Sequence, residues 1–110
     1  MVELTPKMLV KTFLLSSDQT YTVEEQAWMQ KVFLIIQRTA RTKRTFTVDR
    51  VWEAIDRAAK RGTLNMDHAP DHRILGPMMK HTDTIKPTGY YAKSTRRNGG
   101  YRPVSIWETV

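Results

Sequence analysis

Arginine side chains near the C-terminal end form the pattern with the clearest chemical meaning. Two β-prone runs, residues 88–93 and 102–107, flank a turn-rich basic tip at residues 94–101. The Asn-Gly and Gly-Gly steps in the tip supply the positive φ values that close a hairpin. Arg96 and Arg97 would then carry positive charge outward, and guanidinium groups are good donors to phosphate oxygens. The pattern predicts a basic β-hairpin suited to nucleic acid.

A second chemically suggestive cluster lies just before the hairpin, between residues 67 and 83. It holds every histidine and three of the six aspartates of the chain: His68, His72 and His81, with Asp67, Asp71 and Asp83. Three imidazoles and a carboxylate could ligate zinc. Pro70 interrupts the i,i+4 spacing that would place two of these histidines on one helical face, however. We therefore favour a polar turn whose histidines face solvent or phosphate, and we predict no metal.

The sequence contains no arrangement typical of a catalytic centre. It lacks a glycine-rich phosphate loop, a nucleophile elbow and paired helical carboxylates. Asp67, Asp71, His72 and Lys80 could form a nuclease site only if rigid elements brought them together, and no pattern requires this. The absence of cysteine excludes a disulfide framework, a thiolate zinc site and a cysteine nucleophile. We expect no enzymatic activity and no cofactor.

The net charge of +7 is distributed unevenly along the 110 residues. Residues 1–37 hold three basic and four acidic side chains, a net charge of −1. Residues 38–110 hold fifteen basic and seven acidic side chains, a net charge of +8. Such segregation favours an extended anionic partner such as nucleic acid. The alternative is a basic surface that merely keeps the protein in solution.

Length and hydropathy indicate one domain that needs no disulfide or metal site for stability. A chain of this length buries roughly 60–70% of the surface exposed by its unfolded state. The longest apolar run, residues 32–36, is too short to span a bilayer, and the first residues do not resemble a signal peptide. We expect no membrane partner and a cytoplasmic location.

The chain divides into an N-terminal extension, residues 1–21, and a domain at residues 22–110. In the extension, Thr5-Pro6 is a suitable helix start, because proline is favoured at the first helical position. Residues 5–15 are expected to form a short amphipathic helix. Its apolar side chains have no place in the core predicted for residues 22–110, so the helix should pack on the domain or on a second copy, forming a homodimer.

Three helices are expected before the hairpin. Thr22 and Glu25 form a capping box for a helix from residue 23 to about 41. After a very short strand at residues 45–47, Thr47 is predicted to cap a helix from residue 48 to about 60, with Trp52 in the core. Asp71 can cap a third helix, residues 72 to about 81, which Pro77 should kink or shorten.

The tyrosines of the hairpin admit two interpretations. Tyr90, Tyr91 and Tyr101 could stack on nucleobases. Alternation along the last strand requires some aromatic side chains to pack against the helices and leaves room for others to be exposed. Packing in the hairpin is the interpretation we favour.

The order of these elements resembles a winged helix-turn-helix domain. A closer similarity is to small winged-helix proteins encoded by bacterial phages, over about residues 24–110. The stretches that carry it are residues 41–53 (RTKRTFTVDRVWE), Leu75-Gly76, residues 87–90 (PTGY) with Lys93-Ser94, and residues 100–104 (GYRPV) with Ile106-Trp107. The resemblance implies a mainly α, α+β fold, with a three-helix core and a C-terminal hairpin wing.

The resemblance also implies a function and a set of contacts. Such domains bind double-stranded DNA, with the third helix in the major groove and the wing on the backbone or in the minor groove. The residues that would make the contacts are His72, Arg73 and Lys80 in the helix, and Lys93, Arg96, Arg97 and Arg102 in the wing. The implied role is that of a non-catalytic phage or prophage regulatory or accessory factor, associated with the nucleoid of a bacterial host cell.

A protein-interaction module that modulates a host protein is the alternative, since winged helices also bind proteins. Cations gathered on one face would favour DNA. Scattered cations, together with an exposed apolar surface within residues 4–15, would favour a protein partner.

Overall fold

The computed structural model describes residues 3–96 and 102–110, and within these ranges the chain forms an α+β fold. The described elements are α1 (Pro6–Ser16), α2 (Val23–Thr42), β1 (Thr45–Thr47), α3 (Val48–Lys60), two 3₁₀ turns η1 (Met66–His68) and η2 (His72–Ile74), α4 (Leu75–His81), β2 (Ile85–Lys93) and β3 (Pro103–Thr109). The element order predicted for residues 22–110 is therefore observed, with the hairpin strands longer than expected.

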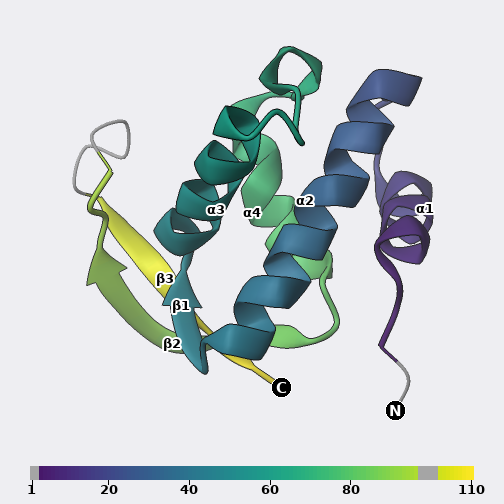
Figure 1. Ribbon diagram of the computed structural model, residues 1–110. Coiled ribbons are helices and arrows are strands. Elements are labelled where there is room, and N and C mark those ends of the chain that lie inside the picture. The colour runs from purple at the N-terminus through teal and green to yellow at the C-terminus, as the bar shows by residue number, and fades with distance from the viewer. Residues whose placement is uncertain (1–2, 97–101) are drawn as a thin grey trace.

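The described strands form one antiparallel sheet in the order β1-β3-β2. β3 is central, with Phe46 of β1 opposite Trp107 on one side and Ile85 of β2 opposite Thr109 on the other. Figure 1 shows the helices side by side on one side of the molecule and the hairpin extending away from them. The sheet contacts α2 and α3 through β1 and β3.

Local capping explains where the first two helices begin. The Thr5 hydroxyl accepts a hydrogen bond from the Met8 backbone N–H at 3.2 Å, and Pro6 occupies the first helical position. At the start of α2, the Glu25 N–H donates to the Thr22 hydroxyl at 3.1 Å, while the Thr22 N–H donates to the Glu25 carboxylate at 2.9 Å. The predicted capping box is confirmed.

The predicted bounds of α3 are confirmed, although one of its expected end contacts is absent. Thr47 occupies the N-cap position, but its side chain makes no capping hydrogen bond. At the other end, Gly62 has φ +77°, its N–H donates to Ala59, and the Thr63 N–H donates to Ala58. This is a Schellman motif, which requires the left-handed conformation that glycine adopts without strain. Gly62 therefore ends the helix.

Pro77 shortens the third helix without kinking it. Asp71 caps the 3₁₀ turn η2, since its carboxylate accepts from the Arg73 N–H at 2.9 Å, and α4 begins only at Leu75. Pro77 is thus the third residue of α4, within the first turn. The first backbone N–H groups of a helix have no intrahelical partner, so a proline there removes no α-helical hydrogen bond.

The hairpin contains a β-bulge. Pro87 lies opposite Trp107 and Tyr91 opposite Ser105, so residues 88–90 of β2 face Ile106 alone on β3. Gly89 has φ +88°, a conformation that other residues rarely adopt. The Thr88 hydroxyl donates to the Ile106 carbonyl at 2.9 Å and accepts from the Tyr90 N–H at 3.1 Å, which fixes the shape of the bulge.

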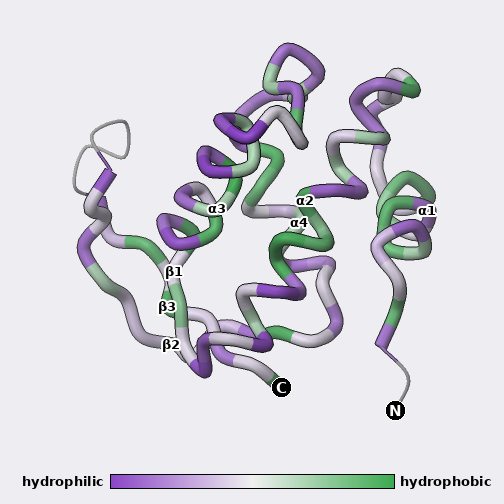
Figure 2. The backbone as a smooth tube through the Cα atoms, in the orientation of Figure 1, coloured by the Kyte–Doolittle hydropathy of each residue, from purple (hydrophilic) through white to green (hydrophobic). Residues whose placement is uncertain are grey.

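Helix α1 shares the core of the other elements. Leu9 is fully buried, and Phe13 packs edge-on to Phe33 of α2 with ring centroids 6.2 Å apart. The Gln37 side-chain amide of α2 donates to the Leu4 carbonyl, which holds the segment before α1 in place. Figure 2 shows hydrophobic stretches of α1, α2 and α4 gathered in the interior and hydrophilic turns on the outside of α3. The predicted amphipathic helix is present and packs on the domain.

Candidate nucleic-acid interface

A buried carboxylate of α3 holds the start of the hairpin tip. Asp49 is 6% exposed, and it accepts hydrogen bonds from the Ser94 hydroxyl at 3.1 Å and the Thr95 backbone N–H at 2.8 Å. The Thr95 hydroxyl is a third, longer donor at 3.4 Å. A buried carboxylate needs several donors to replace its water. Asp49 therefore ties the start of the hairpin tip to α3.

Arg96, predicted to point outward to phosphate, lies against α3. One guanidinium nitrogen is 3.1 Å from the Asp56 carboxylate, and the guanidinium carbon is 5.4 Å from the ring centroid of Trp52. Its side chain is 27% exposed. A guanidinium over an indole face gains a cation–π interaction in addition to the ion pair. Before Arg96 could bind phosphate, it would have to leave these two partners.

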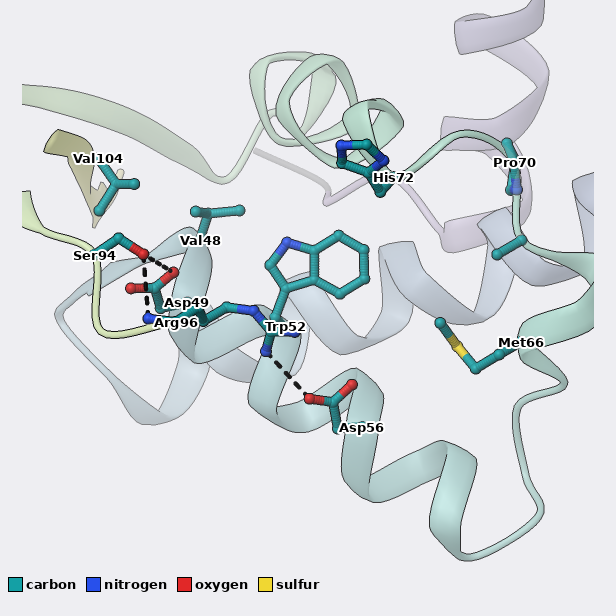
Figure 3. Close-up of a pocket in the computed structure, with 11 residues that line it drawn as sticks. Val48, Asp49, Trp52, Asp56, Met66, Pro70, His72, Ser94, Arg96 and Val104 are labelled. Carbon is teal, nitrogen blue, oxygen red and sulfur yellow. Dashed lines mark hydrogen bonds and ion pairs between the residues drawn. The ribbon is translucent and has the colours of Figure 1, made fainter. Parts of the chain in front are cut away.

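Trp52 lines a cleft of about 640 Å³ between α3, the hairpin near the start of its tip and the turns before α4. Figure 3 shows its indole between His72, above it in the view, and Arg96. Val48, Met66 and Val104 add apolar surface to the lining. The prediction that Trp52 is a core residue is corrected in part, because the cleft leaves one side of its ring accessible. Among the predicted contact residues, the cleft brings together His72 and Arg96.

Arg73 is paired with the residue that caps its own turn. Its guanidinium donates to both carboxylate oxygens of Asp71, at 2.9 and 3.2 Å. The hydrogen bonds from the Arg73 side chain and then from its backbone N–H hold the pKa of the Asp71 carboxyl well below its usual range. The same pairing raises the pKa of Arg73. His72 lies beside this pair, its Nδ1 3.4 Å from Asp71, with the imidazole largely exposed.

Lys80 lies on the exposed side of α4, at a shallow groove of about 400 Å³ between α4 and the end of α1. The groove is lined by Phe13, Ser16, Ser17, Pro77, Lys80 and His81. Lys80 therefore does not join the cleft at Trp52. Along the described length of α4, the other exposed residues are Gly76 and Pro77, whose side chains offer no hydrogen-bonding group.

The remaining predicted cations belong to the hairpin. Lys93 and Arg102 are exposed at the end of the strands next to the hairpin tip, where the Ser94 N–H donates to the Arg102 carbonyl at 2.9 Å. Lys86, near the other end of β2, is 3.6 Å from Glu108 on β3. Arg97 lies outside the described residues, as does Tyr101. The described hairpin thus has cations near both ends, and the one at Lys86 is paired with Glu108.

Two residues that sequence reasoning assigned to packing are exposed. Tyr90 is 74% and Tyr91 68% exposed, so the prediction that these rings pack within the hairpin or on the helices is wrong. Successive residues of a regular strand face opposite sides, but the bulge at residues 88–90 breaks that alternation. Gly89 between Thr88 and Tyr90 is the sequence signal that could have revealed the bulge, since an isolated glycine in a strand often marks one.

The three histidines occupy separate surroundings. His81 is 2.6 Å from the Thr12 hydroxyl through Nε2, and its ring packs edge-on to Phe13. His68 and His72 lie in different 3₁₀ turns and are exposed. Across residues 3–96 and 102–110, no three histidine, aspartate or glutamate side chains are grouped as metal ligands would be.

Comparisons of the chain with protein-family models, curated proteins and solved structures found no match. In the part of the chain that the structure describes, no helix is both long and apolar enough to cross a bilayer. The function has to be inferred from the geometry of the chain itself.

Proposed function

We propose that this protein is a non-catalytic, winged-helix protein that binds double-stranded DNA. The single observation that carries the proposal is the positioned hairpin: α3 and α4 are followed at once by a basic β-ribbon, and Asp49 fixes that ribbon to α3. In a winged helix-turn-helix domain, the helix at the position of α4 enters the major groove and the ribbon lies on the backbone. The net charge of +8 over residues 38–110 suits that placement.

The exposed surface of α4 favours phosphate contacts over base reading. Gly76 and Pro77 cannot hydrogen-bond to base edges through side chains, and Arg73 is held by Asp71. Lysine and arginine contacts to phosphates position a protein on the duplex without specifying a sequence. We therefore propose an accessory DNA-binding role with little sequence preference, rather than recognition of one operator. The resemblance to phage-encoded winged-helix proteins supports a phage or prophage factor that acts on the DNA of a bacterial cell.

Titration of labelled duplex DNA tests this function. At about 50 mM salt, micromolar protein is expected to shift duplexes of unrelated sequence with similar affinity. If about four cations contact phosphates, log affinity should fall against log salt with a slope of roughly −3 to −4. A duplex that stays unbound at low salt would refute the proposal.

A second function is favoured by a specific observation. Leu15 at the end of α1 is 81% exposed, Val23 at the start of α2 is 78% exposed, and Met8 is 48% exposed. Exposed apolar side chains of this size are a feature of protein-binding surfaces when they are contiguous. The alternative function is binding of a host protein through α1 and the start of α2. This alternative is supported if the protein does not bind duplex DNA and if Leu15→Ser and Val23→Ser abolish binding to a candidate host partner.

A further inference from the structure

We propose that Tyr90 and Tyr91 form a stacking site for unpaired nucleobases on the hairpin. This inference depends on the proposed nucleic-acid function and extends it to a substrate class, namely duplex DNA that carries unpaired bases. The site consists of two exposed phenol rings at consecutive positions of β2, with Lys93 and Arg102 near one end of the ribbon.

The rings of Tyr90 and Tyr91 are available for contact. They are 74% and 68% exposed, and neither has an aromatic neighbour or a hydroxyl hydrogen bond among residues 3–96 and 102–110. Tyr21 shows the contrast, because its hydroxyl donates to Gln19 and its ring lies 6.4 Å from that of Phe13. Leaving two adjacent large rings in water forgoes the stabilisation that their burial would give.

The bulge lies immediately before Tyr91 in β2 and includes Tyr90. Thr88 bridges the strands, donating to Ile106 and accepting from the Tyr90 N–H, and Gly89 supplies the left-handed residue. The backbone under the tyrosines is therefore held by specific hydrogen bonds. Bulges of this kind commonly redirect side chains next to functional sites.

Unpaired bases fit this surface better than the other candidate partners. Inside a duplex, the faces of the bases are covered by neighbouring base pairs, and only their edges reach the grooves. An unpaired base leaves its face free, and stacking on an aromatic side chain tolerates any sequence. Over the described hairpin residues 85–96 and 102–110, Glu108 is the one acidic side chain, and it lies beside Lys86. Lys93 and Arg102 are exposed at the other end. This charge suits a strand of phosphates rather than an apolar protein surface.

Binding to three related DNA probes tests the inference: a blunt duplex, the same duplex with a single-stranded thymidine overhang, and the overhang strand alone. The protein should bind the overhang duplex more tightly than the blunt duplex by about tenfold or more, since each stacked base contributes substantially. Tyr90→Leu with Tyr91→Leu should abolish that preference and leave the affinity for the blunt duplex unchanged. Tyr90→Phe with Tyr91→Phe is the matched control, because it retains the rings and should retain the preference.

The contradicting results separate this inference from the function on which it depends. Equal binding of blunt and overhang duplexes by the unaltered protein overturns the stacking site and leaves the duplex-binding function standing. A preference that survives the leucine variant also overturns it, since leucine keeps apolar area but has no π face. Failure to bind any of the three probes would refute both proposals. A thermal melt of each variant shows whether it is folded, and the exposed positions should tolerate both changes.

Discussion

Two arginines expected to contact DNA are held by carboxylates of the same chain. Arg96 pairs with Asp56 and lies over Trp52, whereas Arg73 pairs with both oxygens of Asp71. Exposed ion pairs of this kind contribute little to stability, because water and salt screen them. Their effect is rather to orient the two guanidinium groups and to offset their charge until a stronger anion competes for them.

The pairing of Asp71 gives a titration that can be observed directly. Because its pKa is depressed in the folded protein, the pair stabilises the fold above the unfolded pKa of about 4, and this contribution is lost as pH falls through the folded value. In Arg73→Gln, the pKa should rise toward its ordinary value. Carbon NMR of the side-chain carboxyl checks this. Titration of Asp71 near its ordinary pKa in the unaltered protein would show that the pair does not form in solution.

Asp49 should matter more for stability than any exposed carboxylate of α3. Asp49→Ala leaves the buried Ser94 hydroxyl and the Thr95 N–H without their acceptor, at a cost of about 2–3 kcal/mol in the free energy of unfolding. Glu53→Ala is the control on the same helix, where an exposed pair with Arg50 is removed and a change below about 0.5 kcal/mol is expected. Urea denaturation measures both, and equal effects would mean that the hairpin is not anchored at Asp49.

At the scale of the elements, α1 is part of the packed structure. Leu9 is fully buried, and the Thr12 hydroxyl lies 2.6 Å from Nε2 of His81 at the end of α4. The helix therefore links α2 to α4, the helix that we propose to meet DNA.

Two leucines of α1 provide a matched test of that packing. Leu9→Ala should lower the free energy of unfolding by about 2–5 kcal/mol, because it opens a cavity in a filled core. Leu15→Ala, at an 81% exposed position of the same helix, should change it by less than about 0.5 kcal/mol. Urea denaturation of the two variants compares the costs. If Leu9→Ala proves as mild as Leu15→Ala, α1 does not dock on the helices as described.

Local signals predicted the elements better than they predicted the site. The capping box at Thr22, the Gly62 stop and the short strand before α3 are encoded within a few residues, so their positions could be predicted from the sequence. The position of Pro77 within α4 depended on where η2 ends. Arg96 lies 40 residues from Asp56 and 44 from Trp52 in the chain, and no local pattern indicates such pairs. Tyr90 and Tyr91 are exposed where β2 shifts register against β3, and the pairing register depends on residues distant in the chain.

At the scale of the whole molecule, charge is segregated along the chain. The excess of positive charge lies in residues 38–110, and α1 contributes two exposed cations of its own, Lys7 and Lys11. If net charge alone attracted DNA, a cation at any exposed position would contribute equally to the affinity for DNA. If the hairpin is the DNA interface, its cations should contribute far more to that affinity than the cations of α1.

Charge reversal at two matched pairs of positions distinguishes these cases. Lys93→Glu with Arg102→Glu alters the hairpin, and Lys7→Glu with Lys11→Glu makes the same change of net charge on α1. Affinity for duplex DNA is measured between about 50 and 200 mM salt. The hairpin variant should lose more than about tenfold in affinity and flatten the salt slope by about 2, while the α1 variant stays close to the unaltered protein. Equal losses for the two variants, or an unaltered protein that does not bind the duplex at low salt, would contradict DNA binding through the hairpin.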